Sequence, residues 1–600
     1  MLNRIIHWSL ENRVIVLVAA ALMIIFSIRS AQQAPLDVFP DFAPPQVIVQ
    51  TDAPGFSPEE VEGLITTPLE SALNGTSQLT DIRSQSSAGI SVITCTFEQG
   101  TDLFRARQLV TEKLALARAH LPAEAHEPQM TPIQAPVGMV IKMTLTSDKI
   151  SPFELRDIAD WIIKPRLLAV PGMSQVLIIG GEIKQYQVIV SPERLRDYNL
   201  TLDEVMSAAA GSNRSAGAGF MAGQSQSLII HGEGRVHSID DIANSVVAVR
   251  NNVPIRISQV AEVKIGPAFK IGDASINGKP CVFLTVMKLP WANTINLTAD
   301  ADKALEEIRK SLPEGVEMNT DVFRQADFIN VALSNVNRAM IEGAVLVIIV
   351  LSLFLFSWRS ALISLLAIPL SLVAAILVLT NSGATLNIMT LGGLAIAIGE
   401  VVDDAIIDVE NVYRRLREND RMGNPLPTLS VIYHASVEVR GSVVFATLIV
   451  ALVFVPIFKL TGLEGAIFAP LGVAYIAAIL ASLLVALTIT PALCYLLLPR
   501  AASTHHEDSP TVRFLKRVYR PVIERVINHP YIVAAVSAVM LIAALAVVPF
   551  LGGEFLPEFR EGNFVVLVEG KAGTSLAETV RVGHIVEKRL KEIPEVETVA

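Results

Sequence analysis

Seven apolar stretches, each long enough to cross a lipid bilayer as a helix, constrain this chain more than any other feature. They cover roughly residues 13–31, 338–357, 361–380, 387–412, 439–460, 466–498 and 531–551. A spanning helix needs about 20 mostly apolar residues. The composition agrees, because 18% of the residues are charged, whereas about 25% is usual in soluble proteins. The sequence therefore predicts a multi-pass membrane protein.

The basic residues between these stretches indicate the orientation. They lie before the first stretch, between the second and third, after the fourth and between the sixth and seventh (Arg4, Arg13, Arg359, 414–421 and 513–525). The connections on the other side, "TNSGATLN" and "KLTGLEGA", are nearly free of basic residues. Since basic loops stay in the cytoplasm, we expect a cytoplasmic N-terminus, an external region over about 32–337, and a seventh helix that leads out again. The first apolar run is long and lacks a clean cleavage site, so we interpret it as an uncleaved helix.

The external region has the pattern of small α+β sandwiches. Ser57 and Glu60 form a capping-box pattern after the alternating "QVIVQTDA", and the strand-like "AGISVITCTFE" follows. The order strand, helix, strand recurs at 137–179 and at 280–322, which is typical of split βαβ units. The residues in between are richer in glycine and short strands, so we expect them to form an insertion.

The sequence repeats itself near its end. "PLDVFPDF", which starts at Pro35, follows the first apolar stretch, and "GEFLPEF", which starts at Gly553, follows the seventh. Gly55 in the first copy corresponds to Gly573 in the second. Both copies follow a helix that leads out of the cytoplasm, so the repeat is parallel rather than inverted. We expect these 600 residues to be the N-terminal part of a longer polypeptide with two such copies.

The fourth apolar stretch contains acidic residues. Five of them fall within eleven residues: Glu400, Asp403, Asp404, Asp408 and Glu410. One charged side chain at the bilayer centre costs at least about 2.5–3.5 kcal/mol on insertion scales. On a helix, Glu400, Asp403 and Glu410 share one stripe and the other two share the neighbouring stripe. The helix is therefore expected to have one polar side that faces a crevice in a bundle.

We interpret the cluster as a proton relay, because a carboxyl group in a membrane can take up a proton on one side and release it on the other. Asp403 and Asp404 would titrate as a coupled pair. Two alternatives stay open. Asp408 and Glu410 could pair with Arg414, Arg415 or Arg417 at the cytoplasmic interface, or the carboxylates could bind a hard cation such as Mg²⁺ or Ca²⁺. These three arginines and the two pairs of acids are all in "DDAIIDVENVYRRLR".

Other candidate sites are weaker. The three cysteines, Cys95, Cys281 and Cys494, are isolated and support neither a disulfide framework nor a CxxC zinc site. His120, His126, Glu124 and Glu127 could bind zinc but fit a solvated loop better, and Met139 with Met143 fits a core better than a copper site. No nucleophile–base set indicates an enzyme, and no basic surface indicates nucleic-acid binding.

Three segments resemble a known family. "GEVVDDAIIDVEN" (399–411) resembles the fourth-helix signature of resistance-nodulation-division (RND) efflux pumps, and "EVEGLITTPLESALNG" (60–75) resembles their first porter repeat. "PLDVFPDFAPPQVIVQTDAPGFSPEEVE" (35–62) is similar to the heavy-metal efflux branch. Two positions depart from that branch. Ala397 begins "AIG" where some metal exporters have Asp-Phe-Gly, and Leu567 stands where copper exporters have a methionine that would bind Cu(I).

The resemblance implies a proton-driven exporter of divalent heavy-metal cations in the bacterial inner membrane. Asp403 and Asp404 match the proton site, Glu410 matches the end of the motif, and Glu400 and Asp408 remain possible additional relay or interface residues. The resemblance also implies a homotrimer with a periplasmic adaptor protein and an outer-membrane channel, and no cofactor beyond the proton-motive force. The metal-binding residues stay unknown. The alternatives are a multidrug or amphiphile exporter and a non-transporting accessory or receptor.

The expected fold is an α+β membrane protein, with a polytopic helical bundle and large periplasmic ferredoxin-like α/β-sandwich subdomains for porter and docking functions. The expected divisions are the N-terminus with helix 1 (1–33), the first porter subdomain (34–135), the second porter subdomain (136–180 and 276–335), the docking insertion (181–275), helices 2–6 (336–498), a cytoplasmic connector (499–530), helix 7 (531–551) and the start of a further porter subdomain (552–600).

Overall fold

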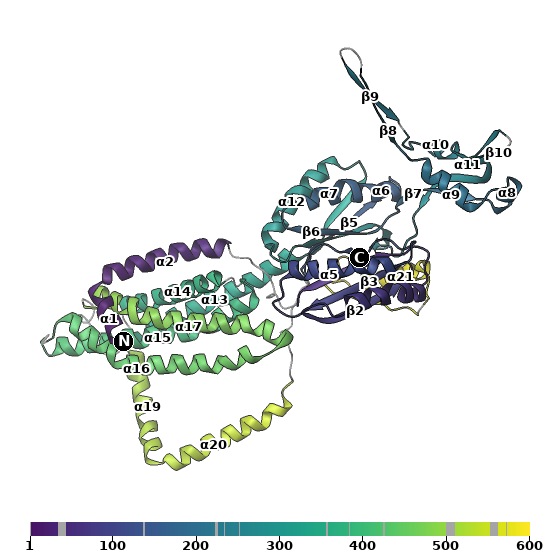
Figure 1. Cartoon of the computed structure of the whole chain (residues 1–600). Coiled ribbons are helices and arrows are strands. Elements are labelled where there is room, and N and C mark those ends of the chain that lie inside the picture. The colour runs from purple at the N-terminus through teal and green to yellow at the C-terminus, as the bar shows by residue number, and fades with distance from the viewer. Residues whose placement is uncertain are drawn as a thin grey trace. The chain divides into compact units, whose positions relative to one another are not determined.

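The computed structural model describes residues 2–33, 44–135, 138–222, 226–232, 234–250, 252–355, 358–382, 385–423, 426–499, 510–552, 562–571 and 573–600 (Figure 1). The chain forms two compact units, which we consider separately. The first consists of Met1–Gly138, Lys288–Thr298 and Gln325–Phe564, and the second of Met139–Met287, Ala299–Arg324 and Val565–Ala600.

Each of the seven apolar stretches lies in a helix. These helices are α2 (Arg13–Gln33), α13 (Gln325–Leu355), α14 (Trp358–Asn381), α15 (Ile388–Arg421), α16 (Thr428–Phe454), α17 (Gly462–Leu497) and α20 (Pro530–Val547). In the described chain, five helical segments are long and apolar enough to cross a membrane: 13–30, 358–381, 428–459, 462–497 and 530–550. α15 has a similar length, but its acidic residues make it less apolar than these five segments.

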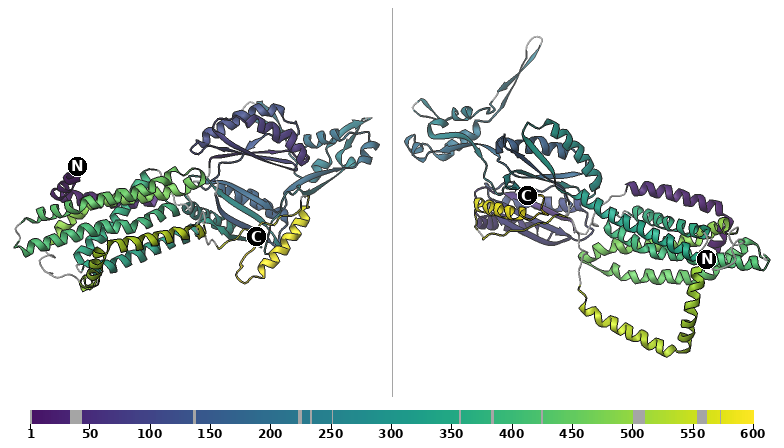
Figure 2. Two further views of the ribbon diagram at one scale, coloured as in Figure 1. Left: turned by 90° about the horizontal axis from the view of Figure 1, so that it is seen from below. Right: turned by 180° about the vertical axis from the view of Figure 1, so that it is seen from behind.

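The helices α14, α15, α16 and α17 form a bundle (Figures 1 and 2). One apolar cluster joins α14, α15 and α17 through buried side chains that include Leu372, Val401 and Ile479. A second cluster joins Val409 and Ile432, and α1 (Leu2–Glu11) contributes apolar side chains to it. Because α15 belongs to both clusters, its residues are the best placed to have polar partners on several neighbouring helices.

The connector before α20 contains an amphipathic helix. α19 (Pro510–Asn528) places Arg513, Lys516, Arg517 and Arg520 on one face and apolar side chains such as Val518 and Val522 on the other. None of the described side chains of α19 or α20 is buried. A basic amphipathic helix between two membrane-length helices suits the water–lipid boundary.

The first α+β sandwich has the predicted ferredoxin-like topology. Its sheet order is β2-β3-β1-β4, from β1 (Gln46–Asp52), β2 (Leu79–Ser87), β3 (Ile90–Phe97) and β4 (Gln129–Met130). Two helical segments, α3–α4 (Pro58–Val61 and Thr67–Leu73, joined by a π-helical turn) and α5 (Leu103–Ala117), contribute to the core. Alternate residues of β3, such as Ile93 and Phe97, are buried in it. The capping box is confirmed, because Ser57 Oγ accepts a hydrogen bond from Glu60 N at 3.3 Å and Glu60 Oε2 accepts one from Ser57 N at 2.8 Å.

The second sandwich repeats this topology with an interruption. Its sheet order is β16-β5-β15-β6, from β5 (Met139–Ser147), β6 (Met173–Gly180), β15 (Val282–Lys288) and β16 (Val316–Arg324). Its helices are α6–α7 (Pro152–Ile158 and Lys164–Leu168) and α12 (Thr294–Ser311). The chain leaves this sheet after its second strand and returns at its third. The ferredoxin-like fold class that the sequence predicts is therefore confirmed in both sandwiches.

The insertion is attached to the second sandwich by a two-stranded ribbon. β7 (Lys184–Val190) pairs antiparallel with β12 (Ala261–Pro267). Beyond this ribbon lie α8 (Pro192–Asp197), α9 (Leu202–Gly211), α10 (Ile239–Ala243), α11 (Ile257–Val260), and the pair β10 (Val246–Arg250) and β11 (Val253–Arg256). The glycine-rich part of the insertion supplies the hairpin of β8 (Ala216–Ala222) and β9 (Ser227–Gly232), which projects in Figure 1.

Within the second unit, the residues from Leu576 to Lys591 pack on the rest through a buried carboxylate. Glu587, on α21 (Leu576–Lys591), is 7% exposed. It accepts hydrogen bonds from Ser275 Oγ at 2.6 Å and from Gly278 N at 3.1 Å, at the small hairpin of β13 (Ser275–Ile276) and β14 (Lys279–Pro280). The segment 562–571 precedes α21 and forms no strand in the described chain.

Gly180, at the end of β6, is expected to be indispensable for the start of the insertion. Its φ is +83°, and a Cβ there would lie 2.3 Å from the carbonyl oxygen of Cys281. Gly180→Ala should lower the free energy of unfolding by about 2 kcal/mol or more, from left-handed backbone strain and the clash together. Gly55→Ala is the control, since φ is +92° but nothing lies within 4 Å of its Cβ. If a denaturation experiment showed that both variants lose the same free energy of unfolding, the clash with Cys281 would not explain the loss at Gly180.

Candidate proton-transfer site

The helix α15 positions all five acidic residues on one continuous scaffold. Asn387 caps it, because its Oδ1 accepts a hydrogen bond from Thr390 N at 2.9 Å and its own N–H donates to Thr390 Oγ1 at 2.8 Å. Further along, Gly393 allows α15 to approach α17 closely, since a Cβ there would lie 2.5 Å from the carbonyl oxygen of Leu471. The absence of a side chain at that glycine therefore sets the spacing of the two helices.

The two acidic stripes differ in burial. Asp404 and Asp408 are each 5% exposed and lie inside the bundle. Asp403 and Glu410 are exposed, and Glu400 is half-buried, on the side of α15 that the described helices leave uncovered. The structure thus separates the adjacent acids Asp403 and Asp404 onto different faces, although both stay in the middle of the helix.

Asp404 has a specific partner on α17. Its Oδ2 accepts a hydrogen bond from Ser482 Oγ at 3.0 Å, and both side chains are buried. Glu400 and Asp403 are close enough to act on Asp404 electrostatically. Ser482 was missed from the sequence, although it stands as a lone hydroxyl in the apolar run "AAILASLLVAL" of a membrane-length stretch. Asp404 is thus a buried carboxyl with a single hydroxyl donor and like charges nearby.

Asp408 is equally buried. Its Oδ2 has no hydrogen-bond partner among the described residues, although the Ser436 hydroxyl on α16 lies close enough to act on the carboxyl group. The described chain does not show the alternative arrangement, in which Asp408 and Glu410 pair with arginines at the cytoplasmic interface. Neither Asp408 nor Glu410 forms an ion pair there, and the nearby Arg414 and Arg415 bind other groups.

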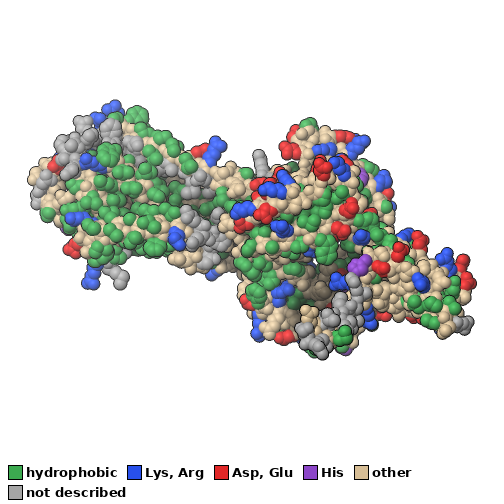
Figure 3. All heavy atoms as spheres, turned by 90° about the horizontal axis from the view of Figure 1, so that it is seen from above, with side chains coloured by type: hydrophobic (Ala, Val, Ile, Leu, Met, Phe, Trp, Pro, Cys, Tyr) green, Lys and Arg blue, Asp and Glu red, His purple; other side chains and the backbone are tan. Residues whose placement is uncertain are grey.

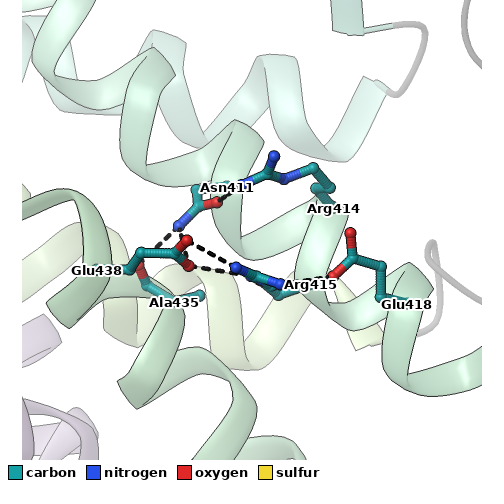
Figure 4. A network of polar contacts seen from close by, with 6 residues as sticks. All are labelled: Asn411, Arg414, Arg415, Glu418, Ala435 and Glu438. Atoms are coloured by element: carbon teal, nitrogen blue, oxygen red, sulfur yellow. Dashed lines mark hydrogen bonds and ion pairs between the residues drawn. The ribbon is translucent and has the colours of Figure 1, made fainter.

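A network of polar contacts links α15 to α16 one turn beyond Asp408 (Figure 4). Arg415 donates to both oxygens of Glu438, from Nη2 to Oε1 at 2.6 Å and from Nε to Oε2 at 3.0 Å, and its Nη1 donates to Glu418 at 2.8 Å. Asn411 Nδ2 donates to Ala435 O at 2.8 Å and to Glu438 Oε2 at 3.3 Å. Two parallel bonds from arginine to a carboxylate give a strong and directional pair. Glu438 was also missed from the sequence.

The metal-site candidates from the sequence do not assemble. In the described part of the chain, no three His, Cys, Asp or Glu side chains converge as a metal site would require, on α15 or around His120 and His126. Glu127 instead pairs with Arg118. Met143 is buried in a sandwich and Met139 is partly exposed at its edge.

The thiols are poor candidates for metal ligands as well. All three cysteines are free and buried. Burial raises the pKa of the Cys95 thiol to about 11 and that of Cys281 to about 12. Because the thiolate is the form that binds metals, burial makes these two thiols weak candidates for metal ligands.

A comparison with known protein families agrees with the acidic helix α15 and with the two ferredoxin-like sandwiches. Residues 5–600 match the sequence model of the AcrB/AcrD/AcrF family. The chain belongs to this family. Its members are RND permeases, which are transporters and not enzymes.

Curated members and a solved structure resemble the chain over its whole length. It is 35% identical over 614 aligned residues to "Cation efflux system protein CzcA" of Alcaligenes sp. (strain CT14), covering 100% of this chain and 57% of that protein. It is 34% identical to "Cation efflux system protein CusA" of Escherichia coli (strain K12), covering 99% and 58%. The crystal structure of a heavy metal efflux pump (crystal form II) matches with a TM-score of 0.82 at 25% identity, covering 99% and 56%. The chain thus spans little more than half the length of these relatives.

Proposed function

We propose that this member of the AcrB/AcrD/AcrF family works in a proton-driven exporter of divalent heavy-metal cations. The observation that carries the proposal is the buried Asp404 on α15, next to Asp403 and bonded to Ser482 in a membrane-length bundle. An ionisable side chain inside such a bundle is costly and marks an ion or proton pathway. Asp403 and Asp404 form the proton site, and Glu410 supports it.

Protonation would act through the contact between α15 and α17. Ionised Asp404 accepts the hydrogen bond of Ser482, and protonation removes its charge from the bundle and weakens that bond. The two states therefore differ in how well α15 and α17 fit together. A movement of α13 would pass directly to β16 of the second sandwich. The reason is that β16 ends at Arg324 and α13 begins at Gln325, with no linker between them.

The metal is the transported substrate, and the proton-motive force is the energy source. The names of the relatives CzcA and CusA and of the solved heavy metal efflux pump support a metal cation. Leu567 favours divalent ions over Cu(I), because Cu(I) prefers a thioether ligand and leucine offers none.

Family membership supports the proposed assembly and location. The chain is a multi-pass membrane protein by family and by its apolar helices. We place it in the bacterial inner membrane, as a homotrimer that works with a periplasmic adaptor protein and an outer-membrane channel.

A tolerance experiment tests this function. The full-length protein would be expressed in a host that lacks its own metal and drug pumps, and the cells would be challenged with zinc, cobalt, nickel, copper and a panel of dyes. We expect increased tolerance of the divalent metals, and no increase with an Asp403→Asn, Asp404→Asn double variant expressed at the same level. Protection against the dyes alone would reject the metal substrate and favour an amphiphile exporter. No protection at all from a well-expressed protein would favour a non-transporting accessory.

A further inference from the structure

Asp408 is a buried carboxyl that the family resemblance leaves without a role. It is 95% enclosed (5% exposed), and Oδ2 lacks a hydrogen-bond partner in the described chain. The match to the fourth-helix signature assigns Asp403, Asp404 and Glu410 only. Because an ionisable side chain is expensive to keep in a membrane helix, a residue that merely packed against its neighbours would be better replaced by an apolar one.

The three helices that pack against α15 each have a buried hydroxyl or thiol in the half that is expected to lie toward the cytoplasm. Ser436 on α16 faces Asp408, and Cys494 on α17 is close enough for the charge of Asp408 to act on it. Thr490 on α17 and Ser364 on α14 are fully buried. The oxygens of the serine and threonine side chains have no hydrogen-bond partner among the described residues. Ser364, Asp408 and Ser436 each adjoin a residue of one buried apolar cluster in the sequence. Those neighbours are Ile363, Val409 and Ala435.

The charged and titratable groups around Asp408 come from several helices. Asp404 is one turn back on α15, about 6 Å along the axis. Cys494 is the titratable group that α17 supplies. On α16, Glu438 lies two residues beyond Ser436 and is held by Arg415. From α1, Ile6 and Leu10 join the apolar cluster, and His7 lies against the ring of Tyr433 on α16, with 5.6 Å between the ring centroids. Along α15, Asp408 therefore lies between Asp404 and the residues of the charged network, Asn411 and Arg415.

The unpartnered oxygens point to internal water. Their atoms are enclosed by this chain itself, so a further helix packed on the outside could not reach them. Buried polar groups in proteins are almost always hydrogen-bonded, and ordered water is the usual partner where protein groups are missing. The unpartnered hydroxyls of Ser436, Thr490 and Ser364 and the Oδ2 of Asp408 are the polar groups from which such a water would take its two to four contacts.

We infer that Asp408 carries protons between Asp404 and the cytoplasm, with water held by Ser436, Thr490 and Ser364 as the connection. The step is a proton transfer only. The O–H bond of protonated Asp404 breaks, water passes a proton on, and an O–H bond forms on Oδ2 of Asp408, which then releases the proton to cytoplasmic water. The inference rests on the proposed function, since it requires Asp404 to be the site from which the proton comes.

Time-resolved infrared spectroscopy on the full-length protein tests the inference without knowing the metal. The protein would be reconstituted in proteoliposomes with its cytoplasmic face outward, and the external pH would be raised rapidly, the proton being the only probe. The carboxylic-acid band that disappears in Asp404→Asn would report the protonation of Asp404. We expect Asp408→Asn to slow the decay of this band about 100-fold, the order that one proton-transfer group contributes. Asp408→Glu should restore most of the rate, and the thermal stability of both variants should match the wild type.

The possible failures are distinguishable. If Asp408→Asn decays within about twofold of the wild-type rate, Asp408 carries no protons and the inference is wrong, while the proposed function stands. If Asp404→Asn removes no titrating band, Asp404 takes up no proton and the proposed function itself fails. Should Asp408→Asn not fold, the variants Ser436→Ala and Thr490→Val, which keep the carboxyl, are expected to slow the decay, and an unchanged rate in both would overturn the inference.

Discussion

Asp404→Asn in the full-length protein is expected to abolish metal tolerance. Asparagine has nearly the same shape and can still accept the hydrogen bond that Ser482 Oγ donates at 3.0 Å, but it cannot take up a proton. Loss of a group that carries the proton should lower transport by about 100-fold or more. Tolerance in a pump-deficient host and metal efflux from washed cells would measure the effect, with expression and trimer formation checked in parallel. Asp403→Asn is expected to have the same result.

Ser482→Ala is the matched control for that experiment. It removes the hydroxyl donor and keeps the carboxyl, so transport should fall far less and its pH dependence should shift. If Asp404→Asn and Asp403→Asn both retained efflux, neither would be part of the proton relay. If Ser482→Ala were as inactive as Asp404→Asn, the hydrogen bond rather than the proton would be the essential feature.

Gly393→Leu is expected to have the second largest effect, on stability and transport together. A Cβ at this position would lie 2.5 Å from Leu471 O and 3.1 Å from Ala474 Cβ, so a leucine must push α15 away from α17. Overpacking of this kind costs about 3 kcal/mol. The same displacement would separate Asp404 from Ser482. The midpoint of thermal unfolding in detergent and the metal efflux of the variant would both be measured.

Gly392→Leu controls for the substitution itself. It is the adjacent residue on the same helix, and nothing lies within 4 Å of the Cβ built on it. Leucine favours the helix over glycine by about 1 kcal/mol, so the stability of Gly392→Leu should be unchanged or slightly higher. Similar losses at both positions would show that the close contact with Leu471 does not set the helix spacing.

Local patterns were enough to predict most of the fold. The seven apolar stretches are helices, and the capping box at Ser57 is present. Alternation in "ISVITCTF" predicted the strand in which Ile93 and Phe97 are buried. Such features depend on residues that are close in sequence, so the 2.0 and 3.6 residue periods reveal them. The apolar pattern marks only part of α15, because the helix continues past 412 to Arg421, where Leu416 and Asn419 are still buried.

The candidate site was only partly predictable, because its details depend on contacts between distant residues. The division of the acids into two stripes followed from helical geometry. Which stripe is buried did not, since it depends on how α16 and α17 pack against α15. Ser482 is 78 residues from Asp404, and Glu438 is 23 residues from Arg415. Neither spacing has a periodic signal, so Asp404 and Asp408 could not be recognised as the enclosed pair from sequence.

The contact between Ser275 and Glu587 has a consequence for how the protein is made. These residues are 312 positions apart, and the membrane-length helices from α13 to α20 lie between them in the sequence. During synthesis the β13–β14 hairpin is therefore finished long before its carboxylate partner is translated. Chains fold from the N-terminus as they emerge, and unfinished surfaces are prone to misassembly. The second unit must wait, with Ser275 and Gly278 lacking their acceptor, until the membrane helices have been inserted, so insertion of the bundle precedes completion of the external unit.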